Sequence, residues 1–357
     1  MSRSVTHFSL HRIAGTELRV VSDVVSGVLP VIEQEEMVIR RYAQLESWPH
    51  RWVTLFILQD LQPLIRQLGG GSEANFPPGG AEGLAYRPVV NIYDLADPSG
   101  CHVFINRQAM EKESYWGDGL AVPALLAHEH AHPLAENDTT RAVRRLGVQI
   151  ETRIEQSMLQ SEAREEKIAS DSADLSSRVY SLLSLLVDKL CLYAPRELFA
   201  NEMTIRSGFG EGLTHLVKLN LANAVKGVTG REDLRHQLQT RVSRGNLTSA
   251  MADLLLLIGD LKGYLDLALD VVPFYRVGQE ARARELEATL EVGVFPYLRP
   301  EVGQAYAELR EEYIMLRPDL TVDQLKPWGR GVIDSIAKTL HEEGLILAYR
   351  LEVAEGP

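Results

Sequence analysis

Two histidines and a glutamate stand close together in the segment ALLAHEHAH, residues 124–132. His128 and His132 are four residues apart, and Glu129 directly follows the first histidine. The surrounding residues are good helix formers, and residues four apart share one face of a helix, so both imidazoles could bind one metal ion. Glu129 would then lie beside that ion, where a carboxylate can take a proton from bound water.

The same spacing also fits a simpler structure, a helix with a solvated face of histidine and glutamate. That interpretation predicts polar neighbours, whereas Leu125, Leu126 and Ala127 precede the motif and Ala131 lies within it. Burying three histidines and a glutamate without a common partner would be costly. We therefore interpret the segment as HExxH, the signature of zinc hydrolases. On a helix His130 points away from the other two histidines, which predicts a core or supporting role.

A catalytic zinc ion needs three protein ligands and one open position for water. The HExxH motif and the later segment ELFAN, residues 197–201, resemble the motifs HExxH and ExxAN of gluzincin metallopeptidases, in particular the CAAX prenyl protease family and its soluble relatives. The resemblance implies that Glu197 is the third ligand and that Asn201 supports a zinc-binding histidine. Aspartate is commoner at the latter position, but an amide oxygen can also accept a hydrogen bond from an imidazole N–H. The helix dipole alone also favours an acid in the first turn of a helix, as at Glu197.

Two other acidic residues compete for the third ligand position. Asp138 completes the pattern HExxHxxAxxD, which is similar to the metzincin pattern with aspartate as third ligand. That pattern requires glycine where Ala135 stands, because the chain turns sharply there, and no Met-turn is evident downstream. Glu202, directly after Asn201, is the remaining candidate.

The ligand set predicts a hydrolytic mechanism. Zinc lowers the pKa of its bound water to about 7, Glu129 can take the proton, and the hydroxide can attack a carbonyl that the ion polarises. His215 is our first choice for a donor to the oxyanion, ahead of Arg206 and Tyr193. The simplest substrate is a peptide bond, so the sequence predicts a zinc metallopeptidase that acts on peptides or proteins.

The composition limits the partners and the location of the protein. The net charge of -12 and the pI near 5.4 argue against nucleic acid as the main partner. Cys101 and Cys191 give no disulfide framework. The first 19 residues lack the apolar core of a signal peptide, and the most apolar run, residues 254–272, carries too many charges to span a bilayer. We therefore expect a cytoplasmic protein without a membrane span.

Hydrophobic patterning predicts a mostly helical α+β protein with two domains. The first, residues 1–219, is expected to be a zincin-like metallopeptidase domain, and the second, residues 220–357, a helical domain that covers the substrate or forms a homodimer. In the first domain we expect a β-hairpin within residues 88–107, which either binds extended substrate as an edge strand or is purely structural. The remaining expected elements are helices over 31–45, 52–68, 141–169, 177–192 and 196–206 and a Gly/Pro loop over 69–80.

The C-terminal half shows helical periodicity throughout. The expected helices span residues 247–272, 281–292, 300–315 and 331–350. Such a region fits an interaction module as well as a substrate domain. A non-proteolytic zinc-binding regulator or interaction protein on a zincin-like fold is therefore the alternative function, and a helical scaffold with an accidental HExxH is a third interpretation.

Overall fold

The computed structural model describes residues 5–68, 86–155 and 165–353. The chain divides into two compact units. Unit 1 combines Met1–Glu136 with Phe199–Asn220, and unit 2 combines Asn137–Leu198 with Leu221–Pro357. The chain therefore leaves unit 1 and returns to it before it enters unit 2 for good.

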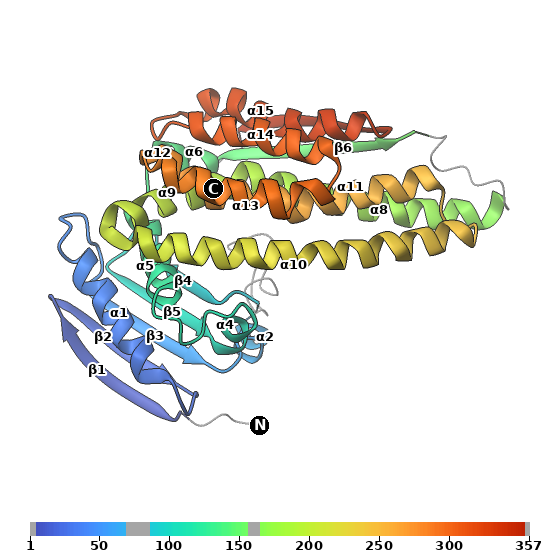
Figure 1. The fold of residues 1–357 in the computed structure, drawn as a ribbon. Coiled ribbons are helices and arrows are strands. Elements are labelled where there is room, and N and C mark those ends of the chain that lie inside the picture. Colours follow the sequence, from blue (N-terminus) through green and yellow to red (C-terminus); the bar gives the residue numbers. More distant parts are fainter. Residues whose placement is uncertain (1–4, 69–85, 156–164, 354–357) are drawn as a thin grey trace. The chain divides into compact units, whose positions relative to one another are not determined.

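Unit 1 is built on a five-stranded mixed sheet (Figure 1). The strand order is β1-β2-β3-β5-β4; the three inner strands are parallel, and both edge strands run antiparallel to their neighbours. The strands are β1 (His7–Ile13), β2 (Thr16–Ser22), β3 (Trp52–Leu58), β4 (Val89–Tyr93) and β5 (Gly100–Asn106). β4 is thus an edge strand, and its outer side is not paired with another strand of the described sheet.

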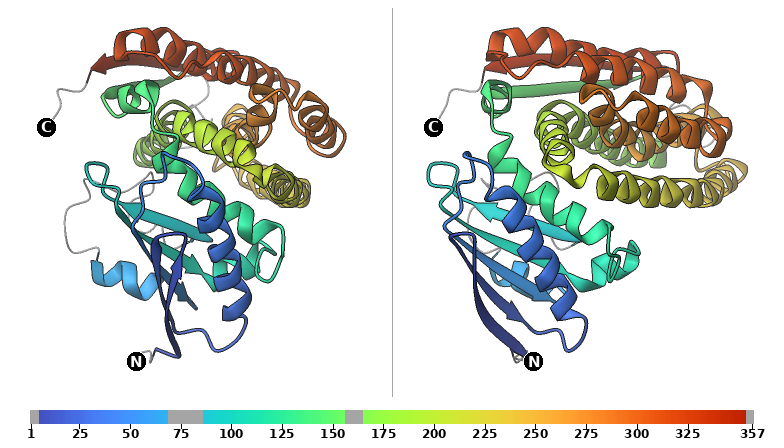
Figure 2. Two further views of the ribbon diagram at one scale, coloured as in Figure 1. Left: turned by 90° about the vertical axis from the view of Figure 1, so that its left-hand side faces the viewer. Right: turned by 60° about the vertical axis from the view of Figure 1, so that its left-hand side comes forward.

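Two helices, α1 (Val28–Tyr42) and α5 (Ala121–Leu134), pack against each other on this sheet (Figures 1 and 2). α1 contacts β2 and α5 contacts β4. Helix α1 turns residues at helical spacing towards the core, and the inner strands contribute alternate residues to it. These buried side chains include Val31, Ile32, Val38, Ile39, Tyr42, Val53, Leu55, Ile57, Val103 and Ile105. The shorter helices of unit 1 are α2 (Gln62–Leu68) and α4 (Arg107–Lys112).

The returning segment, Phe199–Asn220, belongs to unit 1 because it is fixed to both helices. Arg41 of α1 donates from Nε to the carbonyl of Ser207 over 2.7 Å. Gly212 packs so closely on α5 that a Cβ atom there would lie 2.8 Å from the Leu120 carbonyl oxygen. The segment carries the end of α9 (Ala194–Thr204), the π-helical turn Ile205–Phe209 and the start of α10 (Gly210–Ser243).

The described residues of unit 2 form helices and one antiparallel pair of strands, β6 (Leu146–Ile154) and β7 (Leu345–Val353). Helix α15 (Val322–His341) packs on β7 and against α14 (Pro300–Met315), and α12 (Ala268–Arg276) packs against α14. The other helices that begin in this unit are α6 (Asp138–Val143), α8 (Glu165–Asp188), α11 (Ser249–Tyr264) and α13 (Glu280–Gly293). A π-helical turn, Lys189–Tyr193, follows α8.

The mostly helical α+β class is confirmed, as are several individual elements. The hairpin predicted within residues 88–107 is the antiparallel pair of β4 and β5. The HExxH segment is helical, and its helix ends at Leu134, one residue after Pro133. The helix predicted at 300–315 has those same bounds, and the one predicted at 196–206 corresponds to α9. The Gly/Pro loop predicted at 69–80 lies outside the described residues.

Three predicted helices are wrong in part. The first half of the helix predicted at 52–68 is strand β3, a buried inner strand whose nearly continuous apolar run lacks the alternation of a half-exposed strand. The helix predicted at 141–169 contains β6, and the one predicted at 331–350 ends in β7. These strands pair with each other across a long stretch of sequence, which a local pattern does not reveal.

Two helix boundaries predicted beside prolines in the C-terminal half are also wrong. The helix predicted over 247–272 stops before Pro273 and the one predicted over 331–350 starts after Pro327, whereas Pro273 lies inside α12 and Pro327 inside α15. Each proline is the sixth residue of its helix, beyond the first four positions whose N–H groups lack an intrahelical partner, so each helix continues with one backbone hydrogen bond fewer. Among the described residues, no helix combines the length and the apolar character needed to cross a membrane.

Candidate metal centre

His128 and His132 lie next to each other on one face of helix α5. Their ring centroids are 4.8 Å apart and the rings are nearly perpendicular, at 80°. The helix starts where Asp118 accepts hydrogen bonds from the N–H groups of Leu120 and Ala121, each at 2.8 Å. Its first turns are buried, whereas both histidines are only partly buried. The imidazoles are therefore held by a rigid helix and remain accessible at one side.

Asn201 on α9 orients the first of these rings. Its Oδ1 lies 2.8 Å from Nδ1 of His128, and the asparagine is 8% exposed. An amide oxygen can only accept, so Nδ1 of His128 must carry the proton and Nε2 keeps its lone pair. A bond of this kind fixes the tautomer of a metal-binding histidine.

Glu197 lies one helical turn before Asn201 on the same helix. The division between the two units falls inside α9, between Leu198 and Phe199, so helix continuity links Glu197 to the bonded asparagine. One ligand atom each from His128, His132 and Glu197 lies within 4.8 Å of the others. A tetrahedral zinc ion holds its donors about 3.5 Å apart, so small side-chain shifts would close this group around an ion.

Glu129 faces the edge strand of the sheet. The backbone N–H of Asn91 donates to Glu129 Oε2 over 3.1 Å, and the Asn91 side-chain amide donates to the Glu129 carbonyl, also over 3.1 Å. The Asn106 N–H donates to the Pro88 carbonyl, and in an antiparallel ladder only every second residue of a strand bonds to its neighbour. Counting from Pro88, Asn91 is not one of these residues, so its N–H and C=O groups point away from β5. The edge strand thus fixes the carboxylate beside the two histidines.

His130 points away from these residues into the core, as the helical geometry predicts. Its Nε2 lies 2.8 Å from Glu35 Oε1, and neither side chain is exposed. Burial alone lowers the pKa of the imidazole, but the charge of Glu35 and the hydrogen bonds to Cys101 and Glu35 together more than offset this and raise the pKa of His130 to about 10. The pair therefore ties α5 to α1 from within the protein.

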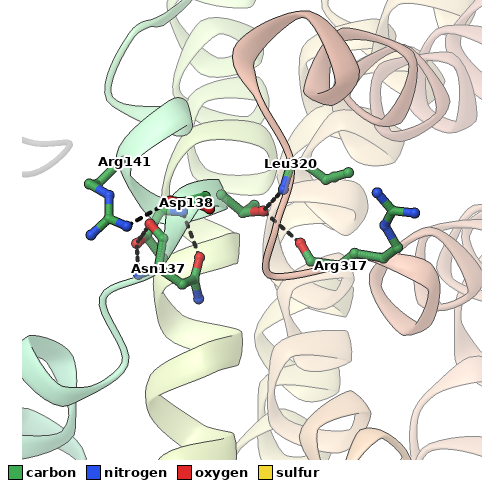
Figure 3. Close-up of polar contacts among 7 residues, drawn as sticks. Asn137, Asp138, Arg141, Arg317 and Leu320 are labelled. Atoms are coloured by element: carbon green, nitrogen blue, oxygen red, sulfur yellow. Dashed lines mark hydrogen bonds and ion pairs between the residues drawn. The ribbon is translucent and has the colours of Figure 1, made fainter. Parts of the chain in front are cut away.

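The other sequence-predicted site residues lie elsewhere. His215 pairs with Asp118, with 2.8 Å between Nε2 and Oδ2, and it is not among the described groups that could hold a metal. Asp138 is 66% exposed and pairs with Arg141 over 2.7 Å (Figure 3). Glu202 is absent from those groups as well. Of the three candidates for the third ligand, the structure brings only Glu197 to the histidines.

Sequence reasoning missed two partners of the motif, Asn91 and Glu35. Asn91 carries no signal of its own, because its role depends on which strand becomes the edge. Glu35 did leave a signal: it occupies the apolar stripe of α1, three or four residues from Val31, Ile32, Val38 and Ile39. An acid at such a position is buried and needs a partner.

No protein-family model, curated protein or solved structure matches this chain. The likeness to gluzincins therefore rests on the two short motifs.

Proposed function

We propose that this protein is a zinc-dependent peptidase with His128, His132 and Glu197 as metal ligands. The observation that carries the proposal is the convergence of these three ligand atoms within 4.8 Å. Two imidazoles and one carboxylate match the donor set of catalytic zinc sites. The bond from His128 to Asn201 supports the fit, because it leaves Nε2 free of a proton and able to bind Zn²⁺.

The surroundings of the HExxH helix support a zincin-like assignment of unit 1. A mixed sheet carries the helix, and its antiparallel edge strand β4 contacts that helix. The outward peptide groups of such an edge can pair with an extended peptide, a form of β-augmentation. Substrate would then lie along β4, next to Glu129.

The residues around the metal ligands have defined tasks in this proposal. When bound, Zn²⁺ supplies a Lewis acid and an acidified water. Glu129 accepts a proton and returns it to the leaving amine, and Asn91 holds the carboxylate in place through its N–H. Asn201 keeps His128 in the binding tautomer. His215, which pairs with Asp118, has no task in this proposal.

Metal content tests the proposal directly. We expect His132→Ala and Glu197→Ala each to contain one equivalent of zinc less than the wild type, as measured by elemental analysis. Both variants should also lose activity against an unstructured protein. The matched controls Asp138→Ala and Glu202→Ala should lose neither. Unchanged zinc in His132→Ala would refute the site, and loss in Asp138→Ala instead of Glu197→Ala would move the third ligand. Zinc at this site without hydrolysis would favour a regulatory protein.

A second prediction concerns the orientation of His128. Asn201→Ala should weaken zinc binding by about 10- to 100-fold, because the ring loses the acceptor that fixes its tautomer. Asn201→Asp keeps an acceptor oxygen and should retain the wild-type affinity within a few-fold. Competition with a chromogenic chelator measures both values. Equal loss in the two variants would show that the 2.8 Å bond does not act through the imidazole proton.

A further inference from the structure

A second group of potential metal ligands lies inside unit 1, apart from the ligands described above. It consists of His50 before β3, Cys101 on β5 and His130 on α5, with exposed fractions of 3%, 0% and 0%. One ligand atom of each lies within 4.8 Å of the others. The group therefore joins three segments that are distant in sequence.

Hydrogen bonds on the far side of each ring leave one nitrogen of each histidine for this group. His50 Nδ1 lies 2.6 Å from the Pro98 carbonyl and must donate to it, so Nε2 is the remaining nitrogen. His130 directs Nε2 to Glu35, so Nδ1 remains. His50 Nε2 is buried without a hydrogen-bond partner, and the Cys101 thiol is the one side chain that interacts with the buried His130 Nδ1 among the described residues. Carbonyl and carboxylate acceptors behind the ring are the usual supports of metal-binding histidines.

Unpartnered polar atoms are rare in a protein core because each forfeits its hydration. Here the orphaned His50 Nε2 converges with the Cys101 thiol and with His130 Nδ1. The Trp48 ring covers this group, with its centroid 4.7 Å from that of His50 and 5.5 Å from that of His130. The arrangement indicates an occupant that takes electron pairs from nitrogen and sulfur.

We propose that His50 Nε2, Cys101 Sγ and His130 Nδ1 supply three ligands to a second zinc ion. A thiolate and two imidazoles favour Zn²⁺ over Mg²⁺, Ca²⁺ or Mn²⁺, which prefer oxygen ligands. The ion would hold the segment before β3, strand β5 and helix α5 together inside unit 1. This inference does not depend on the proposed peptidase activity, because the two sites share no ligand.

Cobalt substitution in the full-length protein tests the inference, since a cysteine thiolate bound to Co²⁺ gives a near-ultraviolet charge-transfer band that histidine and carboxylate ligands do not. We expect the band in the wild type and in Cys191→Ser. Cys101→Ser should lose the band and also one equivalent of bound metal. Cys191 is the matched control, a second buried free thiol outside both described ligand groups. No band in the wild type, or a band that persists in Cys101→Ser, would overturn the proposal.

A second measurement leaves the cysteine intact and so remains decisive if Cys101→Ser does not fold. In His132→Ala, which disrupts the first site, X-ray absorption at the zinc edge should detect one sulfur at about 2.3 Å from zinc. A zinc shell of nitrogen and oxygen alone, or no bound zinc, would contradict the second site. Failure of the peptidase proposal would instead leave this sulfur signal unchanged.

Discussion

Glu129→Gln is expected to lower the turnover number by about 10²- to 10⁴-fold, the usual contribution of a general base. Glutamine keeps the shape of the side chain and can still accept the Asn91 N–H bond through its amide oxygen. It cannot take up a proton at neutral pH. The proton transfer should therefore be lost while the three metal ligands stay in place.

Turnover of an unstructured protein and zinc content should be measured on the same preparation. Glu111→Gln is a matched control, because its carboxylate is 45% exposed and pairs with Arg107 on a short surface helix. The control should retain wild-type activity, and Glu129→Gln should retain wild-type zinc. Full activity in Glu129→Gln would rule out this glutamate as the base, whereas loss of zinc would give it a structural role instead.

Asp260→Ala is expected to lower the free energy of unfolding by about 3–5 kcal/mol. Arg231 donates to Asp260 through two parallel bonds, of 2.7 Å from Nε and 2.9 Å from Nη2. The side chains are only 4% and 2% exposed. Burial raises the pKa of Asp260 even though the guanidinium acts against it, which shows how strongly this site is dehydrated. Removing the carboxylate leaves the buried guanidinium without its main partner.

Urea unfolding followed by circular dichroism measures the change. Glu280→Ala provides the control, because Glu280 and Arg284 form a pair with 65% and 73% exposed side chains on α13. Removing such a surface pair should change the free energy of unfolding by at most about 1 kcal/mol. Similar losses in both variants would contradict the assignment of the Arg231–Asp260 pair as a buried, stabilising interaction.

The sequence predicted the helices whose signals are local. The segment Pro300–Met315 begins with proline and keeps helical periodicity to its end, and α5 carries both histidines at a spacing that only a helix brings together. Local signals failed where pairing partners are remote. β6 and β7 form an antiparallel ladder from Leu146 opposite Val353 to Ile154 opposite Leu345, and neither strand is stable without the other.

The candidate site divides in the same way. Residues within one helix, such as His128, Glu129 and His132, follow from spacing alone. The proximity of Glu197 was an expectation from the gluzincin resemblance, and the structure brings it to the histidines. The contacts made by Asn91, Glu35, His50 and Cys101 depend on strand order and helix packing. No spacing rule connects them to residues 128–132.

The interrupted course of unit 1 has a consequence for the timing of its maturation. The bonded pair His128 and Asn201 is 73 residues apart, and the chain between Glu136 and Phe199 belongs to unit 2. A growing polypeptide therefore emerges from the ribosome with its sheet and both histidines long before α9. Until then a nascent chain lacks Glu197 and the acceptor for His128. On the proposed function, a newly made molecule stays inactive until α9 has been synthesised, and the order of synthesis delays its first cleavage.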